Sequence, residues 1–108
     1  MRFARRRVDT NQAAIVKALR KIGAHVWDTH LVGNDFPDLV VGWRQRTVMI
    51  ECKWLRPTHE GGRHGETRGQ QIARETWVGD KWIVVTSPED AVNQMIEVVV
   101  GAKPKGGV

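Results

Sequence analysis

Three ionisable residues, Asp38, Glu51 and Lys53, have the types and spacing that hydrolysis of a charged ester requires. Residues 47 to 53 are rich in apolar and β-branched side chains, which predicts a strand. Because side chains alternate between the two faces of a strand, Glu51 and Lys53 project from the same face. The pattern therefore places an acid and a base side by side, with apolar residues on the opposite face.

A second predicted strand, at residues 38 to 42, brings Asp38 toward this pair. A two-residue turn centred on Arg44 and Gln45 makes the two strands an antiparallel hairpin in which Asp38 lies opposite Glu51. Opposed Cβ atoms in such a pair are about 4.5 to 5.5 Å apart, and like charges at that distance are destabilising unless a positive charge lies between them. A register shift of one residue would instead send Asp38 to the other face.

A divalent cation is the positive charge that suits these two acids. Mg²⁺ takes oxygen ligands, often one or two carboxylates together with waters and a substrate phosphate. Asp38, Glu51 and the backbone carbonyl of Cys52 therefore form a plausible partial coordination shell with positions left open. The cation would polarise a scissile phosphate, while Lys53 would orient the attacking hydroxide and offset the negative charge that grows in the transition state.

A purely structural interpretation stands beside this one. Glu51 and Lys53 can be an ordinary ion pair on an exposed strand face, and Asp38 a strand-end residue bonded to its own backbone. Each assumption is reasonable alone. Together they leave two acids facing each other within an apolar hairpin, which favours the metal site.

The elements that must position these residues follow from periodicity and from cap and turn residues. Asp9 and Thr10 are predicted N-caps of the first helix, Gly23 ends it, and Gly33-Asn34-Asp35 forms a turn. The predicted elements are a helix (10–22), strands (24–28, 38–42 and 47–53), a helix (70–77), a strand (81–86) and a helix opened by Ser87-Pro88 and running to about residue 98. This order, α-β-β-β-α-β-α, predicts an α/β or α+β domain with helices flanking a mixed sheet.

Composition limits the class of protein. The 108 residues suffice for one small domain, which we place at 9–100, between a basic N-terminal arm (1–8) and a flexible C-terminal tail (101–108). Seventeen Lys and Arg against twelve Asp and Glu give a net charge of +5, which favours a polyanionic partner. One cysteine and no membrane-length apolar run predict a cytoplasmic protein without disulfides or membrane contact. The arginines of the arm are either a solvated, frayed terminus or a contact to backbone phosphates.

Five further arginines surround the predicted hairpin and the aperiodic segment from residue 54 to 69, where we expect a functional or mobile loop. A basic rim beside two acids is what a phosphodiester substrate needs once a metal neutralises the carboxylates. Simple solvation of these side chains is the alternative. The DNA-binding candidates are Arg44, Arg46, Arg56, Arg63 and Arg68.

Pro37-Asp38, then twelve residues, then Glu51-Cys52-Lys53 resembles the signature of the PD-(D/E)XK nucleases. The surrounding residues, over about 8 to 96, resemble the small phage and bacterial proteins of the VRR-NUC group. They are the run from Asn11 to Arg20, Gly23-Ala24, Thr67, Gln70, Trp77 and the run from Trp82 to Ala91.

The resemblance implies a restriction-endonuclease-like fold and hydrolysis of DNA that depends on Mg²⁺ or Mn²⁺. It also implies a homodimer that acts on branched DNA such as Holliday junctions, in a bacterial host cell and encoded by a phage or prophage. Asp38 and Glu51 become metal ligands, Lys53 the catalytic lysine and Gln70 a supporting glutamine. Many relatives have a glutamate on the first helix where this chain has Gln12, whose amide can hold a metal-bound water.

Two other functions compete with a nuclease. One is a nucleic-acid-binding module that keeps the fold without cutting, and the other is a basic interaction domain with no site. Asp38, Glu51 and Lys53 are all present, which argues against the binding module. The interaction domain predicts that Asp38→Ala costs little beyond stability and that Mg²⁺ does not change the melting temperature.

Overall fold

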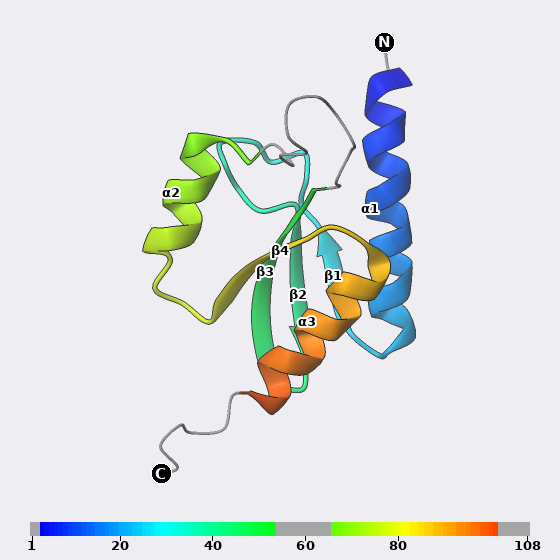
Figure 1. The fold of residues 1–108 in the computed structure, drawn as a ribbon, viewed down its shortest axis with the longest axis vertical. Helices are drawn as coiled ribbons and strands as arrows, with labels where there is room; N and C mark the ends of the chain where they lie inside the picture. The colour runs from blue at the N-terminus through cyan, green and yellow to red at the C-terminus, as the bar shows by residue number, and fades with distance from the viewer. Residues whose placement is uncertain (1–2, 54–65, 102–108) are drawn as a thin grey trace.

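The computed structural model of the chain describes residues 3–53 and 66–101, with side chains from Asn11 onward. A four-stranded mixed sheet in the order β1-β2-β3-β4 is combined with three helices, so the protein is α+β (Figure 1). The pairs β1–β2 and β2–β3 are antiparallel and β3–β4 is parallel. The elements are α1 (Phe3–Lys21), β1 (His25–Asp28), β2 (Leu39–Trp43), β3 (Arg46–Cys52), α2 (Arg68–Thr76), β4 (Lys81–Val85) and α3 (Pro88–Val100).

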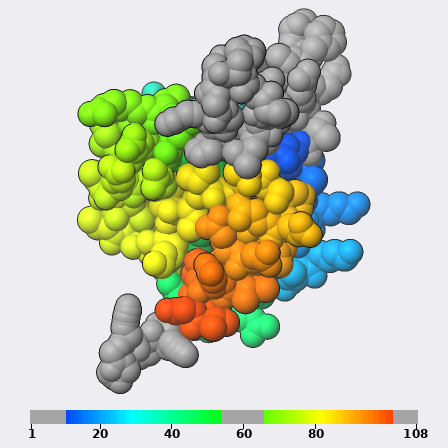
Figure 2. Space-filling model, viewed as in Figure 1, coloured from blue at the N-terminus to red at the C-terminus, as the bar shows by residue number. Residues whose placement is uncertain are grey.

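The hydrophobic core lies between one face of the sheet and the helices α1 and α3, which also contact each other. Leu19, Leu39, Ile50 and Met95 are completely buried in it. The third helix, α2, lies on the opposite side of the molecule from α1 and buries no side chain fully (Figure 1). Figure 2 shows α2 and the β4–α3 segment forming one continuous surface. Because Val48 and Ile50 on β3 face the core, Glu51 projects from the other face of the sheet.

The hairpin of β2 and β3 has the predicted turn and register. Arg44 and Gln45 have φ values of 51° and 68°, which matches the two-residue turn that follows the twist of an antiparallel pair. Val41 pairs with Val48 and Leu39 with Ile50. Continuing this register by one residue beyond β2 places Asp38 across from Glu51.

The predicted start of the first helix is wrong. The helix α1 begins at Phe3, so Asp9 and Thr10 lie inside it and do not cap it. Ala and Arg are strong helix formers, and no Gly or Pro interrupts residues 3 to 8, so the helix extends through most of the predicted arm. Whether this basic segment contacts phosphates stays a prediction.

The remaining element boundaries differ by only a few residues. Thr67 caps α2, which begins two residues before the predicted Gln70, and Ser87 caps α3 as predicted, although this helix reaches Val100. The segments 54–65 and 102–108 lie outside the described residues, so the predicted loop and tail stay predictions there. No helix within residues 3–53 and 66–101 is long and apolar enough to cross a membrane.

Gly23 ends α1 by adopting a left-handed conformation, with φ of 95°. The Gly23 amide donates to Arg20 O, and the following Ala24 amide donates to Leu19 O at 3.1 Å, which closes the helix end. A Cβ at residue 23 would find space, since its nearest neighbour is Trp43 Nε1 at 3.9 Å. The conformation, and not crowding, therefore requires glycine.

We expect Gly23→Ala to lower the free energy of unfolding by about 1 to 2 kcal/mol, the cost of a left-handed backbone for a residue with a Cβ. Urea titration followed by circular dichroism measures this change. Gly42→Ala is the matched control, because Gly42 has no positive φ and its added Cβ would lie 4.0 Å from Arg46 O. Equal stability of the two variants would contradict the assignment.

Candidate active site

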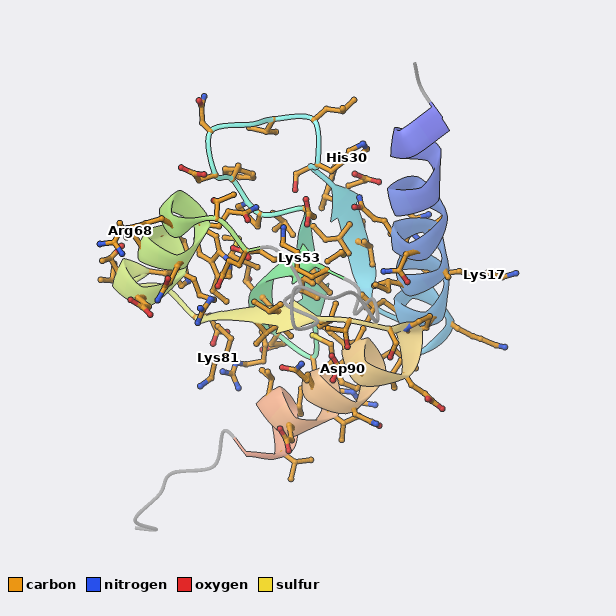
Figure 3. The ribbon with its side chains drawn as sticks, turned by 45° about the horizontal axis from the view of Figure 1, so that its top comes forward. Lys17, His30, Lys53, Arg68, Lys81 and Asp90 are labelled. Carbon is orange, nitrogen blue, oxygen red and sulfur yellow. The ribbon has the colours of Figure 1, made fainter. Side chains whose placement is uncertain are left out.

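The candidate site lies at the end of the β2–β3 pair opposite to the Arg44-Gln45 turn. Asp38 immediately precedes β2, while Glu51 and Cys52 end β3. The Lys53 amide donates to Val85 O at 2.9 Å and so fixes the backbone of Lys53 beside the end of β4. Figure 3 shows Lys53 over the sheet, whereas Lys17 on α1 points outward. The sheet thus gathers the three predicted residues at one end.

Glu51 is completely buried, with 0% of the residue exposed. Trp82, on the neighbouring strand β4, donates its indole Nε1–H to Glu51 Oε2 at 2.9 Å. The other oxygen, Oε1, is buried and accepts no hydrogen bond from the described part of the chain. An exposed Glu51–Lys53 surface pair, the structural alternative, is therefore wrong.

The pKa of the Glu51 carboxyl is raised from 4.5 to about 7. Burial is the largest cause, and the neighbouring Glu66 carboxyl adds to it as a hydrogen-bond partner and as a like charge. The Trp82 indole and the Lys53 ammonium lower the pKa only in part. Glu51 therefore lies where a proton or a metal cation is stabilised.

The Asp38 carboxylate is turned toward the backbone of β3. Its Oδ2 accepts the Cys52 amide hydrogen at 2.7 Å. Burial raises the pKa of Asp38, and the hydrogen bond from Cys52 and the charge of Lys53 oppose this shift. The strand-end amide of Cys52 thus holds one oxygen of the Asp38 side chain, which the sequence did not predict. The expectation that the Asp38 and Glu51 carboxylates face each other stays a prediction.

The Cys52 thiol takes no part in the site. The side chain lies in the core with 5% of the residue exposed, and burial raises the pKa of the thiol, with Asp38 adding to the shift. Only the backbone carbonyl of Cys52 remains as a candidate metal ligand, as predicted. Within residues 3–53 and 66–101, no three His, Cys, Asp or Glu side chains converge closely enough to hold a metal ion.

The donor set nevertheless suits a hard cation with few protein ligands. Glu51 Oε1 is a buried carboxylate oxygen without a donor, and the free energy cost of such an atom falls when a cation binds it. Asp38 can keep the Cys52 amide on Oδ2 and bind with its other oxygen. Mg²⁺ commonly uses one or two carboxylates and fills its remaining positions with water.

Sequence reasoning missed Glu66 and Arg74. Arg74 Nε and Nη2 donate to the two oxygens of Glu66, each at 2.8 Å, and Glu66 lies beside Glu51. Glu66 immediately precedes the N-cap Thr67, and Arg74 lies two turns further along α2. The cap motif from Thr67 to Gln70, which predicts where this helix begins, was the one available signal that the two residues can pair.

The predicted role of Gln70 is not supported by its contacts. Gln70 Oε1 accepts the Thr67 amide hydrogen at 3.0 Å, while the Gln70 amide donates to Thr67 Oγ1 at 3.0 Å. These two bonds form a capping box that starts α2. The Gln70 side-chain oxygen therefore caps α2, and the role of Gln70 as a supporting glutamine stays a prediction.

Gln12 is buried on α1 with 4% of the residue exposed, and its predicted contact to a metal-bound water stays a prediction. Gln12 Nε2 donates to Asp28 Oδ1 at 3.1 Å, and the same oxygen contacts His30 Nδ1 at 2.6 Å. Burial acts to raise the pKa of Asp28, but the bonds from His30 outweigh it and the pKa is lowered. Since the charges of His30 and Asp28 also shift the pKa of Asp38, this cluster borders the site.

The expectation that Arg44 and Arg46 rim the carboxylates is wrong. Both lie at the hairpin turn, and β3 separates them from Glu51 and Cys52. Arg46 binds Asp80 through two hydrogen bonds of 2.8 and 2.6 Å and donates to Val98 O, so its guanidinium joins the hairpin to β4 and α3. Arg44 lies over the Trp43 ring at 5.1 Å. Arg68 is exposed on α2 (Figure 3), whereas Arg56 and Arg63 lie outside the described residues.

Comparison of the chain with protein-family models, with curated proteins and with solved structures found no match. A functional proposal therefore depends on the residues themselves and on their arrangement in the structure.

The buried Glu51 carboxyl predicts a pH dependence of stability in metal-free protein. The folded state binds the Glu51 proton more tightly than the unfolded chain, because its pKa is about 7 instead of 4.5. The free energy of unfolding should therefore fall as pH rises from about 4.5 through 7, by roughly 3 kcal/mol from this group. Urea unfolding in EDTA across this range measures the slope.

Glu51→Gln is the control that isolates this group, since Asp38 and the histidines remain in both proteins. We expect the difference in stability between wild type and variant to change with pH in the stated direction. A constant difference from pH 4.5 to 8 would contradict the raised pKa of Glu51.

Proposed function

We propose that the protein is a metal-dependent DNA endonuclease of the PD-(D/E)XK type, with a restriction-endonuclease-like fold and a place in the VRR-NUC group. The observation that carries the proposal is the buried Glu51 Oε1, which has no hydrogen-bond donor in the described part of the chain and lies at a strand end shared with Asp38 and Lys53. A buried carboxylate without hydrogen-bond partners lowers the stability of the fold, and such groups are found mainly at functional sites. Binding of a metal cation by Glu51 Oε1 would be such a function.

Asp38, Glu51 and the Cys52 carbonyl are the groups that would hold Mg²⁺ or Mn²⁺. The cation would supply a Lewis acid that polarises the scissile phosphate and acidifies a water. The Lys53 side chain makes no hydrogen bond or ion pair with the described residues, so its ammonium is available to hold the attacking water and to stabilise negative charge on the phosphate. Trp82 fixes the orientation of the Glu51 carboxylate through its indole.

Branched DNA as substrate and a homodimer as the active form belong to the proposal, together with a bacterial, phage-derived setting. The net charge of +5 supports a polyanionic partner. Exposed apolar side chains on α2 and the turn after it, including Ile72 at 47% and Val78 at 95%, support contact with a second copy.

A binding module without cleavage is the second candidate. The observation that favours it is the hydrogen bond from the Cys52 amide to Asp38 Oδ2, which engages one of the two oxygens that a metal ion would need. Such a protein would bind DNA without any need for a metal.

Cleavage of labelled four-way junction, flap, single-stranded and linear duplex DNA distinguishes the two candidates. With Mg²⁺ or Mn²⁺ we expect cutting that EDTA abolishes and that Lys53→Ala and Asp38→Ala lower by about 100-fold or more, because each removes a group that acts in the transition state. Lys17→Ala is the control, since this exposed lysine points away from the site.

Preference for the four-way junction would support the proposed substrate. Binding of DNA without cutting, with either metal and at every DNA structure, would reject the nuclease and leave the binding module. Loss of activity in Lys17→Ala as large as in Lys53→Ala would show that general charge, and not the site, is responsible.

A further inference from the structure

Glu66 is an acidic residue of the site to which the proposed mechanism gives no role. It immediately precedes Thr67, the N-cap of α2, so the capping box fixes its backbone. Its carboxylate is oriented by Arg74, whose guanidinium donates to both oxygens at 2.8 Å. It lies next to the Glu51 carboxyl, close enough to act as a hydrogen-bond partner of that group. Two carboxyl groups thus meet at the strand end.

The described residues do not neutralise this pair fully. Trp82 supplies one neutral donor to Glu51 Oε2, and Glu51 Oε1 receives none. The fork of Arg74 is directed at Glu66, not at Glu51. Lys53 acts on Glu51 only through its field, since it forms no ion pair with a described residue. A positive species between the two carboxyls would satisfy Oε1 and remove the repulsion.

We propose that Glu66 is a carboxylate ligand of the metal site and binds the divalent cation together with Glu51 Oε1. This inference rests on the proposed metal-dependent function and adds a ligand to its site. A carboxylate has about four lone-pair positions, so its two oxygens can accept the Arg74 fork and still bind a cation. Arg74 is then a positioning residue, which holds the ligand in a fixed orientation.

The added ligand also changes what the site can bind. Hard divalent cations such as Mg²⁺ and Mn²⁺ prefer carboxylate oxygens, and each additional carboxylate strengthens binding in the absence of DNA. With Glu51 and Glu66 as its centre, the site binds a cation while Asp38 Oδ2 keeps its hydrogen bond from the Cys52 amide. A role of Glu66 limited to its ion pair with Arg74 would leave the metal affinity unchanged.

Isothermal titration of Mn²⁺ into the full chain, without DNA, tests the inference. We expect Glu66→Gln to weaken Mn²⁺ binding by about 10-fold or more, as loss of a ligand or of its close support does. Glu75→Gln is the matched control on α2, because Glu75 is exposed and its side chain accepts a hydrogen bond from Gln71. The Mn²⁺ affinity of this variant should stay within about 2-fold of wild type. Glu51→Gln should abolish the binding.

A second readout distinguishes a ligand from a structural residue. In EDTA, Glu66→Gln should melt at the same temperature as wild type or higher, because the new amide can donate to Glu51 Oε1 and one like charge is gone. Addition of Mn²⁺ should then stabilise this variant less than wild type. Arg74→Lys keeps the charge but removes the fork, and we expect a smaller, several-fold loss of Mn²⁺ affinity.

Wild-type Mn²⁺ affinity in both Glu66→Gln and Arg74→Lys would overturn the role of Glu66. The nuclease proposal would survive that result if Lys53→Ala still abolished metal-dependent cleavage. Failure of the wild-type chain both to bind Mn²⁺ and to cut DNA would reject the function itself and the inference with it.

Discussion

The Glu51 carboxylate is placed where an isolated charge is costly, and the arrangement of the site follows from that placement. The residue is 0% exposed, its Oε2 accepts the Trp82 indole and its Oε1 has no donor within residues 3–53 and 66–101. Replacing such a group by an apolar residue of similar size is often neutral or stabilising, so its presence is not explained by stability. Perturbed and unsatisfied ionisable groups concentrate at functional sites, which is the reason to seek a cation here.

Regular backbone geometry at the strand end brings the other groups to Glu51. The turn at Arg44 and Gln45 sets the β2–β3 register, and the parallel pair β3–β4 brings Trp82 within reach of Glu51. At the other end of the same strands, Arg46 and Asp80 join the hairpin to β4. A packed strand pair determines side-chain positions more closely than a loop does, which suits a site whose ligands must stay in place before the cation arrives.

The hairpin was predictable because its pattern is local. Both strands are rich in apolar and β-branched residues, and with one face buried a register shift would have exposed Leu39, Val41, Val48 and Ile50 to solvent. The alternation of side chains between the two faces of a strand placed Glu51 and Lys53 together. The start of α1 was not predictable from caps, since good cap residues also occur within helices when the preceding residues favour helix. The orientation of Asp38, the Glu66–Arg74 pair and the Arg46–Asp80 pair depend on contacts between side chains on different elements, for which the sequence carries no periodic signal.

The central claim is that a divalent cation binds at Glu51, and the tryptophans offer a direct measurement of it. The Trp82 indole Nε1–H is bonded to Glu51, whereas the Trp43 indole donates to Ile22 O at 3.0 Å, near the hairpin turn. In ¹H–¹⁵N spectra of the metal-free protein, small additions of paramagnetic Mn²⁺ should broaden the Trp82 indole signal first and leave the Trp43 signal sharp, and excess Mg²⁺ should reverse the effect. Broadening of both signals together, or of neither, would contradict a metal site at Glu51.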